Sequence, residues 1–217
     1  MPKENILEKL KESLLNLDVE ATKKKAEEAL EAGIRPLEAL RVMTESIRKI
    51  GELFADMQLF LPDVMMAAEA FEAGSAILRS ALSEEDAERM KMGTVVIGTV
   101  KGDIHDLGRK IVAVMLSAAG FKIHDIGNDQ SPENFVSTAE KVNADIIAMS
   151  CLMSSCLPYM EDTIQILEDD GVRDKYKILV GGGPGVLSPD YAKKMGADGY
   201  GKDGDEAVKE AKRLLGK

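Results

Sequence analysis

Two aspartates flank one of the chain's only two histidines in the segment VKGDIHDLGRK, residues 100–110. Asp103 lies two residues before His105, where a loop backbone can bring carboxylate and imidazole within hydrogen-bond reach. A carboxylate that accepts a proton from one ring nitrogen leaves a lone pair on the other, as around metal-ligating histidines. Gly108 leaves the start of the predicted next helix without a side chain, so a bulky group can approach. The spacing favours His105 as a ligand over an ordinary exposed or turn-bonded loop histidine.

A single histidine cannot hold a free metal ion, because such sites usually take three or four protein ligands. The sequence contains no HxH, HExxH or CxxC pattern that could supply the others. A metal whose remaining positions are filled by an organic macrocycle needs only one axial ligand from the protein. The histidine segment is therefore typical of a macrocycle-bound metal.

Two other segments follow predicted strands, namely Ser150-Cys-Leu152 and the glycine run that contains Gly181 and Gly182. Adjacent glycines admit a flat or elongated ligand, although a tight turn is the alternative interpretation. The first strand lacks GxGxxG, and the chain has neither a phosphate loop nor a GxSxG elbow, which disfavours dinucleotide binding, nucleotide hydrolysis and serine hydrolase chemistry. Cys151 and Cys156 are too few for a disulfide scaffold, so we expect two small buried residues.

Apolar residues recur at helical spacing through the first 82 residues and predict four helices. The second helix is expected to begin near Asp18, the third after Pro36 and the fourth at Pro62. Strands alternating with helices follow, with strands predicted at 94–100, 121–126, 144–150, 175–182 and 197–201. The charged segment at 83–90 marks the predicted linker.

These patterns predict two domains, a four-helix bundle over residues 1–88 and an α/β domain over 89–217. The second is expected to be a doubly wound, flavodoxin-like (Rossmann-like) sheet of five parallel strands. In such sheets ligands bind at the carboxyl ends of the strands, near the point where strand order reverses. The histidine loop, the Ser150 segment and the glycine run all fall at such ends.

Composition excludes several classes of partner. The chain has 38 acidic and 28 basic side chains and a net charge of -10, which disfavours nucleic acid and anionic membranes. No apolar run approaches the roughly 20 residues of a membrane span, and no secretory leader pattern opens the sequence. We therefore expect a cytoplasmic protein.

The three segments together resemble the cobalamin-binding signature DxHxxG…SxL…GG. Asp103, His105 and Gly108 form the first element; 41 residues separate it from Ser150-x-Leu152, and 28 more precede Gly181-Gly182. The segment at 50–71 is similar to the helical cap beside this domain in cobalamin-dependent methionine synthase. The same cap occurs in the small corrinoid proteins of methanol, methylamine and quaternary-amine methyltransferase systems, which are the closest match because the similarity covers nearly the whole chain.

The resemblance implies a role for each matching residue. His105 would replace the cofactor's own base as the lower ligand of cobalt, the base-off/His-on form, with Asp103 holding its imidazole and Ser150 extending the hydrogen-bond chain. Four residues would line the slot for the displaced nucleotide tail: Gly108, Leu152, Gly181 and Gly182. Three would cover the upper face of the ring, with plain bundle core as the alternative: Phe54, Leu61 and Val64. Cys151 inside the second element and Gly183 after the glycine pair depart from the usual pattern.

The implied function is that of a corrinoid methyl carrier without catalytic activity of its own. A substrate-specific methyltransferase of the methylamine, methanol, betaine or methoxy type would load the methyl group. A second methyltransferase would pass it to tetrahydrofolate or a thiol coenzyme, and a reductive activase would restore the cobalt. The alternatives are a cobalamin-dependent sensor, for which the first helix leaves no room for a DNA-binding head, and the cobalamin subunit of a mutase.

Overall fold

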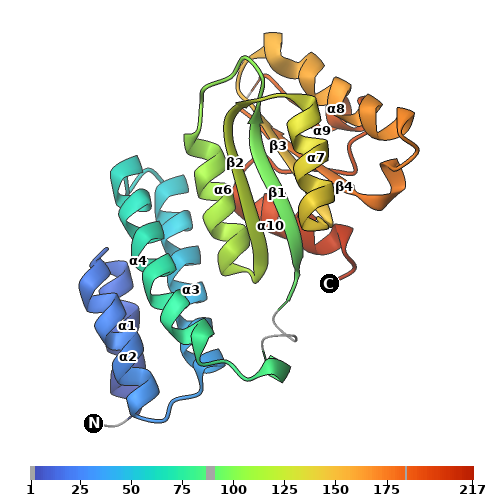
Figure 1. Ribbon diagram of the computed structural model, residues 1–217. Helices are drawn as coiled ribbons and strands as arrows, with labels where there is room; N and C mark the ends of the chain where they lie inside the picture. The colour runs from blue at the N-terminus through green and yellow to red at the C-terminus, as the bar shows by residue number, and fades with distance from the viewer. Residues whose placement is uncertain (1–2, 87–90, 184) are drawn as a thin grey trace. The chain divides into compact units, whose positions relative to one another are not determined.

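The computed structural model describes residues 3–86, 91–183 and 185–217, and the chain divides into two compact units, Met1–Lys91 and Met92–Lys217 (Figure 1). The predicted boundary between residues 88 and 89, with the end of the predicted linker, falls outside the described residues. The described part of that linker is helical from Glu84 to Asp86. Among the described residues, no helix has the length and apolar character needed to cross a membrane.

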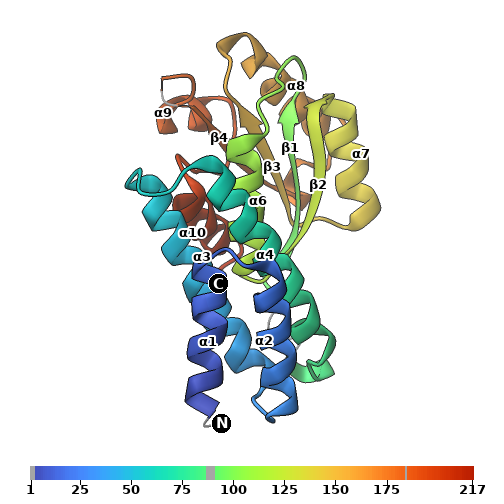
Figure 2. The ribbon, with the colours of Figure 1, turned by 90° about the vertical axis from the view of Figure 1, so that its left-hand side faces the viewer.

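Between residues 3 and 80 the first unit forms four helices that lie side by side (Figure 2): α1 (Lys3–Leu15), α2 (Val19–Glu31), α3 (Pro36–Ala55) and α4 (Leu61–Ser80). The predicted start signals are confirmed, since Asp18 caps α2 by accepting a hydrogen bond from Ala21 N at 2.9 Å and Pro36 opens α3. α4 begins at Leu61, one residue before the predicted start.

Gly74 of α4 lies close to side chains of α2 and α3. A Cβ added to this α4 residue would lie 2.7 Å from Met43 Cε of α3 and 2.9 Å from Thr22 Cγ2 of α2. Because real Cβ atoms essentially never show such contacts, a larger residue at this position would force Met43 or Thr22 to shift. The first unit therefore has a core of its own.

The second unit is the predicted five-stranded parallel sheet, with strand order β2-β1-β3-β4-β5. Its strands are β1 (Gly93–Val100), β2 (Phe121–Gln130), β3 (Ile146–Cys151), β4 (Lys177–Gly182) and β5 (Gly199–Tyr200). Its α-helices are α6 (Leu107–Ala118), α7 (Pro132–Val142), α8 (Leu157–Asp169), α9 (Pro189–Lys194) and α10 (Gly204–Leu214). Strand order reverses between β1 and β3, so the carboxyl ends of these two strands form the switch point.

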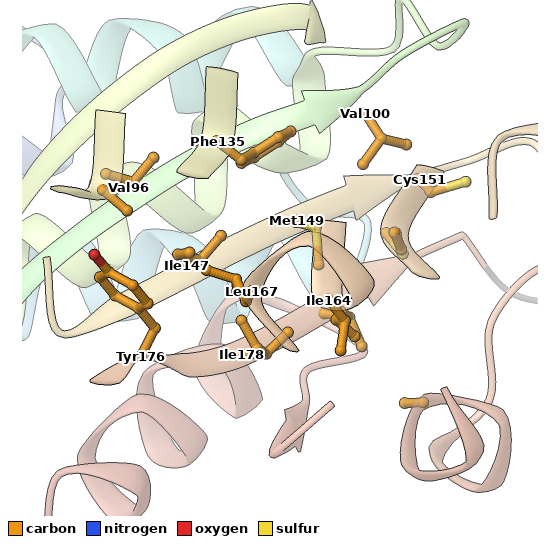
Figure 3. Packing of buried hydrophobic residues seen from close by; sticks show 14 of the residues in the cluster. Val96, Val100, Phe135, Ile147, Met149, Cys151, Ile164, Leu167, Tyr176 and Ile178 are labelled. Atoms are coloured by element: carbon orange, nitrogen blue, oxygen red, sulfur yellow. The ribbon is translucent and has the colours of Figure 1, made fainter. Parts of the chain in front are cut away.

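Each face of the sheet is covered by its own helices. Along β1, alternate residues such as Val96 and Val100 join Ile147 and Phe135 in the core under α7 and α8 (Figure 3). The intervening residues, among them Ile97, pack with Ala148 against α6 and α10. Both faces are thus buried, as in other parallel sheets.

β2 continues four residues beyond the predicted end at 126. Its pairing with β1 shifts register twice, after Ile97 and again after Gly98, and ends with Val100 opposite Gln130. The added residues are glycine and polar, so they lack the apolar pattern that marks a strand. Hydrogen bonds to the histidine loop hold them, from Asp129 N to Asp103 O at 3.1 Å and from Gly102 N to Asp129 Oδ1 at 2.7 Å.

Replacing Phe135 with alanine should lower the free energy of unfolding by about 3–5 kcal/mol, because the ring is fully buried and its loss leaves a cavity. Phe60→Ala is the matched control, since its ring is 71% exposed and its removal should change stability by less than about 0.5 kcal/mol. Urea denaturation followed by circular dichroism measures both. Equal losses in the two variants would contradict the packing described here.

Candidate functional site

The histidine loop leaves the carboxyl end of β1 and is organised around the Asp103 carboxylate, which is fully buried. Asp103 Oδ1 accepts two hydrogen bonds from His105, one from the backbone N at 2.9 Å and one from ring Nδ1 at 2.6 Å. Gly102, with φ +81°, permits the turn that brings the carboxylate inward. The predicted aspartate–imidazole pair is therefore present.

The second carboxylate oxygen ties this loop to the neighbouring strand. Asp103 Oδ2 accepts a hydrogen bond from Leu152 N, just beyond the end of β3, at 2.5 Å. Burial by itself raises the pKa of Asp103, but the hydrogen bonds from Leu152 N, His105 N and the imidazole outweigh it and set the pKa below its ordinary value. Asp103 is consequently an ionised acceptor that connects the two strand ends at the switch point.

An ionised Asp103 determines the tautomer of His105. Because a carboxylate can only accept, Nδ1 must carry the proton, and Nε2 of the neutral ring keeps its lone pair. No hydrogen bond among the described residues uses Nε2, and the side chain is 50% exposed. An accessible nitrogen lone pair of fixed direction fits the single axial ligand that a macrocycle-bound metal requires.

The expected hydrogen-bond chain from Ser150 through Asp103 to His105 differs in the structure. In the described part of the chain, the carboxylate accepts from Leu152 N and no hydrogen bond joins it to Ser150 Oγ. Ser150 pairs with Thr99 and Gly181 in the sheet, and strand alternation directs it to the face covered by α6 and α10. A backbone amide, which the residue types do not reveal, therefore donates the hydrogen bond that joins Asp103 to the end of β3.

Glycine is present at the motif positions for two different physical reasons. A Cβ on Gly181 would lie 2.9 Å from Gly201 O, and one on Gly182 would clash with Cys151 O, so close strand packing requires both. A Cβ on Gly108 would meet nothing within 4 Å. The absence of a side chain at Gly108 therefore leaves open space beside the first turn of α6, as a bulky ligand would need.

Large apolar side chains are exposed on the two loops that Asp103 joins. Ile104, Leu152 and Met153 are 76%, 41% and 40% exposed, and they come from the loops after β1 and β3. Exposed large apolar residues on neighbouring loops are typical of a surface that binds a ligand with an apolar body. The sequence motif predicted Leu152 but gave no signal for Ile104 or Met153.

Both cysteines lie beside this site as free, buried thiols, as expected. The Cys151 thiol donates to Met153 O at 2.9 Å, and burial raises its pKa to about 11, so it stays protonated at neutral pH. The described residues contain no group of three or more His, Cys, Asp or Glu side chains able to hold a free metal ion.

The residues expected to cover the ring's upper face lie near the turn between α3 and α4. Phe54 and Leu61 are half-buried, whereas Val64 is buried within the structure. Their neighbours Met57 and Phe60 are 84% and 71% exposed. The turn therefore presents more apolar surface than the three predicted residues alone.

Comparison with known proteins identifies the family of this chain. Two B12 binding domain families match the chain, one over residues 93–209 and the other over residues 6–79. The chain is 41% identical to dimethylamine corrinoid protein 1 of Methanosarcina acetivorans over 216 residues, covering 99% of this chain and 100% of that one. This chain belongs to the corrinoid proteins.

A second corrinoid protein of the same organism, trimethylamine corrinoid protein 1, is 40% identical over 214 residues. The match covers 98% of this chain and 98% of that protein. The methanol:cobalamin methyltransferase complex MtaBC of Methanosarcina barkeri shares the fold, with a TM-score of 0.81 and 24% identity over 100% of this chain and 81% of that one. The predicted family, the helical-plus-flavodoxin-like fold class and a cobalamin or related corrinoid as cofactor are thus confirmed.

Histidine-selective ¹⁵N labelling should show two sets of ring signals, since the chain has only two histidines. At pH 8 the His105 set should correspond to a neutral ring protonated at Nδ1, because Asp103 accepts that proton. Asp103→Asn should abolish this preference, whereas Asp106→Asn, which alters a carboxylate paired with Lys110, should leave it unchanged. A wild-type ring protonated at Nε2 would contradict the described geometry.

Proposed function

We propose that this corrinoid protein is a methyl carrier in which His105 Nε2 is the lower ligand of cobalt, so that the cofactor binds base-off and His-on. The observation that carries this proposal is an imidazole held through Nδ1 by a buried carboxylate, while the side chain itself is 50% exposed. When bound, the corrinoid supplies a cobalt centre that accepts a methyl group from one partner and yields it to another.

The role of Asp103 follows from its hydrogen bonds. It holds a proton on Nδ1 of His105 and so increases the electron density available at Nε2, as carboxylates do for other metal-bound histidines. Because Leu152 N and His105 N also donate to it, the carboxylate remains ionised and fixed in place. Asp103 thereby sets both the orientation and the basicity of the ligand.

We assign the slot for the nucleotide tail to the motif residues on the α6 and α10 side of the sheet. Ser150 and Gly181 are register neighbours there, and Gly108 leaves space at the start of α6. Leu152 follows the end of β3, and Gly182 pairs with Cys151 at the end of β4. The open space beside Gly108 would allow an elongated group to enter next to the first turn of α6.

We assign the covering of the ring face opposite His105 to Phe54, Leu61 and Val64 of the helical unit. The exposed apolar side chains at the same turn, Met57 and Phe60, support a role in shielding an apolar surface. Val64 is buried, and it would support Leu61 from within the unit.

Methylated amines are the substrate class that the comparisons favour. Relatives named for dimethylamine and trimethylamine are 41% and 40% identical, and this small difference does not separate the two substrates. The structural match to the methanol system rests on fold alone. These relatives also favour a carrier over a cobalamin-dependent sensor or a mutase subunit.

Three partners follow from the carrier role. A methylamine:corrinoid methyltransferase would load the methyl group, a second methyltransferase would transfer it to tetrahydrofolate or a thiol coenzyme, and a reductive activase would restore oxidised cobalt. The chain itself would not catalyse either transfer. Its free thiols accord with a reducing compartment, and we place the carrier in the cytoplasm.

His105→Ala should remove the axial nitrogen from cobalamin-reconstituted protein and weaken hydroxocobalamin binding about 10- to 100-fold. The ultraviolet–visible and electron paramagnetic resonance spectra of the cobalt(II) form measure the loss. His124→Ala is the matched control, because the other histidine lies on β2 and should leave both spectra unchanged. An unaltered cobalt(II) spectrum in His105→Ala would refute axial ligation.

The methyl donor can be identified with the carrier and the methyltransferases that co-purify with it from the native host. Among monomethylamine, dimethylamine, trimethylamine, methanol and betaine, we expect one of the methylated amines to methylate the reduced carrier. Loss of the cobalt(I) absorption on donor addition measures the transfer. Methylation by methanol or betaine alone would overturn the proposed substrate class while leaving the carrier role intact.

A further inference from the structure

Arg109 is a buried charge beside the cofactor motif that the motif does not include. It lies in the first turn of α6, directly after Gly108, and is 3% exposed. Its guanidinium donates to Thr99 Oγ1 at 3.1 Å, to Asn128 Oδ1 at 2.8 Å and to Asp125 Oδ1. All three nitrogens of the guanidinium thus donate a hydrogen bond.

Two of these partners hold the backbone of the histidine loop. Thr99 Oγ1 donates to His105 O at 3.0 Å, and Asn128 Nδ2 donates to Ile104 O at 3.1 Å. Arg109 is therefore linked to two consecutive carbonyl groups of the loop, to that of His105 through Thr99 and to that of Ile104 through Asn128. The three elements involved are β1, β2 and α6.

The donor and acceptor roles in this network are fixed by chemistry. The single Thr99 hydroxyl proton goes to the His105 carbonyl, which can only accept, so the lone pair of the hydroxyl must receive the proton of Arg109 Nε. The Asn128 amide is oriented in the same way, because a guanidinium only donates and a carbonyl only accepts. Removing the guanidinium would leave both side chains free to turn away from the loop.

Burial of this guanidinium has a cost. Desolvation lowers the pKa of Arg109, although the nearby Asp106 carboxylate opposes the shift. Asp125 compensates part of the charge, and its own side chain is 34% exposed. A buried ion pair is weak grounds for stability, which favours a role in fixing one local conformation.

We infer that Arg109 is a positioning residue that fixes the Ile104–His105 backbone through Thr99 and Asn128, so that His105 presents Nε2 in one direction. Asp103 holds the ring and the amide of His105, while the Arg109 network holds the two carbonyl groups. This inference rests on the proposed ligand role of His105. The hydrogen bonds of Arg109, Thr99 and Asn128 are present in the chain without cofactor.

The test compares two disrupting variants with two controls. Arg109→Gln removes the guanidinium, and Thr99→Val removes only one hydroxyl at nearly constant volume. Thr99→Ser keeps the hydroxyl and should restore the wild-type behaviour. Arg173→Gln controls for the loss of a partly buried arginine, because Arg173 is 19% exposed in the same unit and binds Tyr176 O, Gly196 O and Asp198 instead.

Two readouts separate positioning from general stability. In the cofactor-free protein, hydrogen exchange of amides 103–106 should quicken in Arg109→Gln and Thr99→Val but not in Thr99→Ser or Arg173→Gln. After loading with hydroxocobalamin and reduction to cobalt(II), the share of molecules with nitrogen coupling from the ligand should fall in the same two variants. Their affinity for hydroxocobalamin should weaken about tenfold.

The outcomes distinguish this inference from the proposed function. Wild-type protein without nitrogen coupling refutes the ligand role of His105 and with it the inference. Wild-type protein with full coupling, matched by Arg109→Gln and Thr99→Val with unchanged exchange, overturns the inference alone. Should Arg109→Gln fail to fold, the contrast between Thr99→Val and Thr99→Ser decides the question.

Discussion

The site depends on one buried carboxylate that accepts three hydrogen bonds. Asp103 binds the ring and the amide of His105 with one oxygen and Leu152 N with the other, so it joins the ends of β1 and β3 where strand order reverses. Without these donors a buried carboxylate would be protonated and could not fix the tautomer of the imidazole. The position of the His105 ring and the joining of two strand ends therefore have the same cause.

Two layers of contacts surround this carboxylate. The inner layer comes from the motif loops. The outer layer comes from Arg109, Thr99 and Asn128, whose hydrogen bonds hold the backbone carbonyls of Ile104 and His105. Irregular loops have many accessible backbone conformations, and each hydrogen bond to a carbonyl removes some of them. The Ile104–His105 backbone is thus restricted although it lies outside any regular element.

The motif glycines show how one sequence pattern can have separate physical causes. Gly181 and Gly182 are required by neighbouring backbone, at Gly201 O and Cys151 O, in the protein without cofactor. Gly108 borders open space and is not required by packing. A substitution at the first two positions therefore disturbs the strand ends before any question of ligand arises, whereas one at Gly108 occupies space beside the ligand loop.

The sequence by itself determined the fold class, the number of helices in the bundle, the cap at Asp18 and the Asp103–His105 pair, because caps, periodicity and short-range spacing act locally along the chain. Tertiary structure decided that Leu152 N, and not the Ser150 hydroxyl, binds Asp103, and that β2 extends through polar residues to Gln130. It also brought Arg109, Thr99 and Asn128 together. Backbone amides are identical in every residue, and contacts across 10 or 19 positions depend on strand register, so no local pattern encodes them.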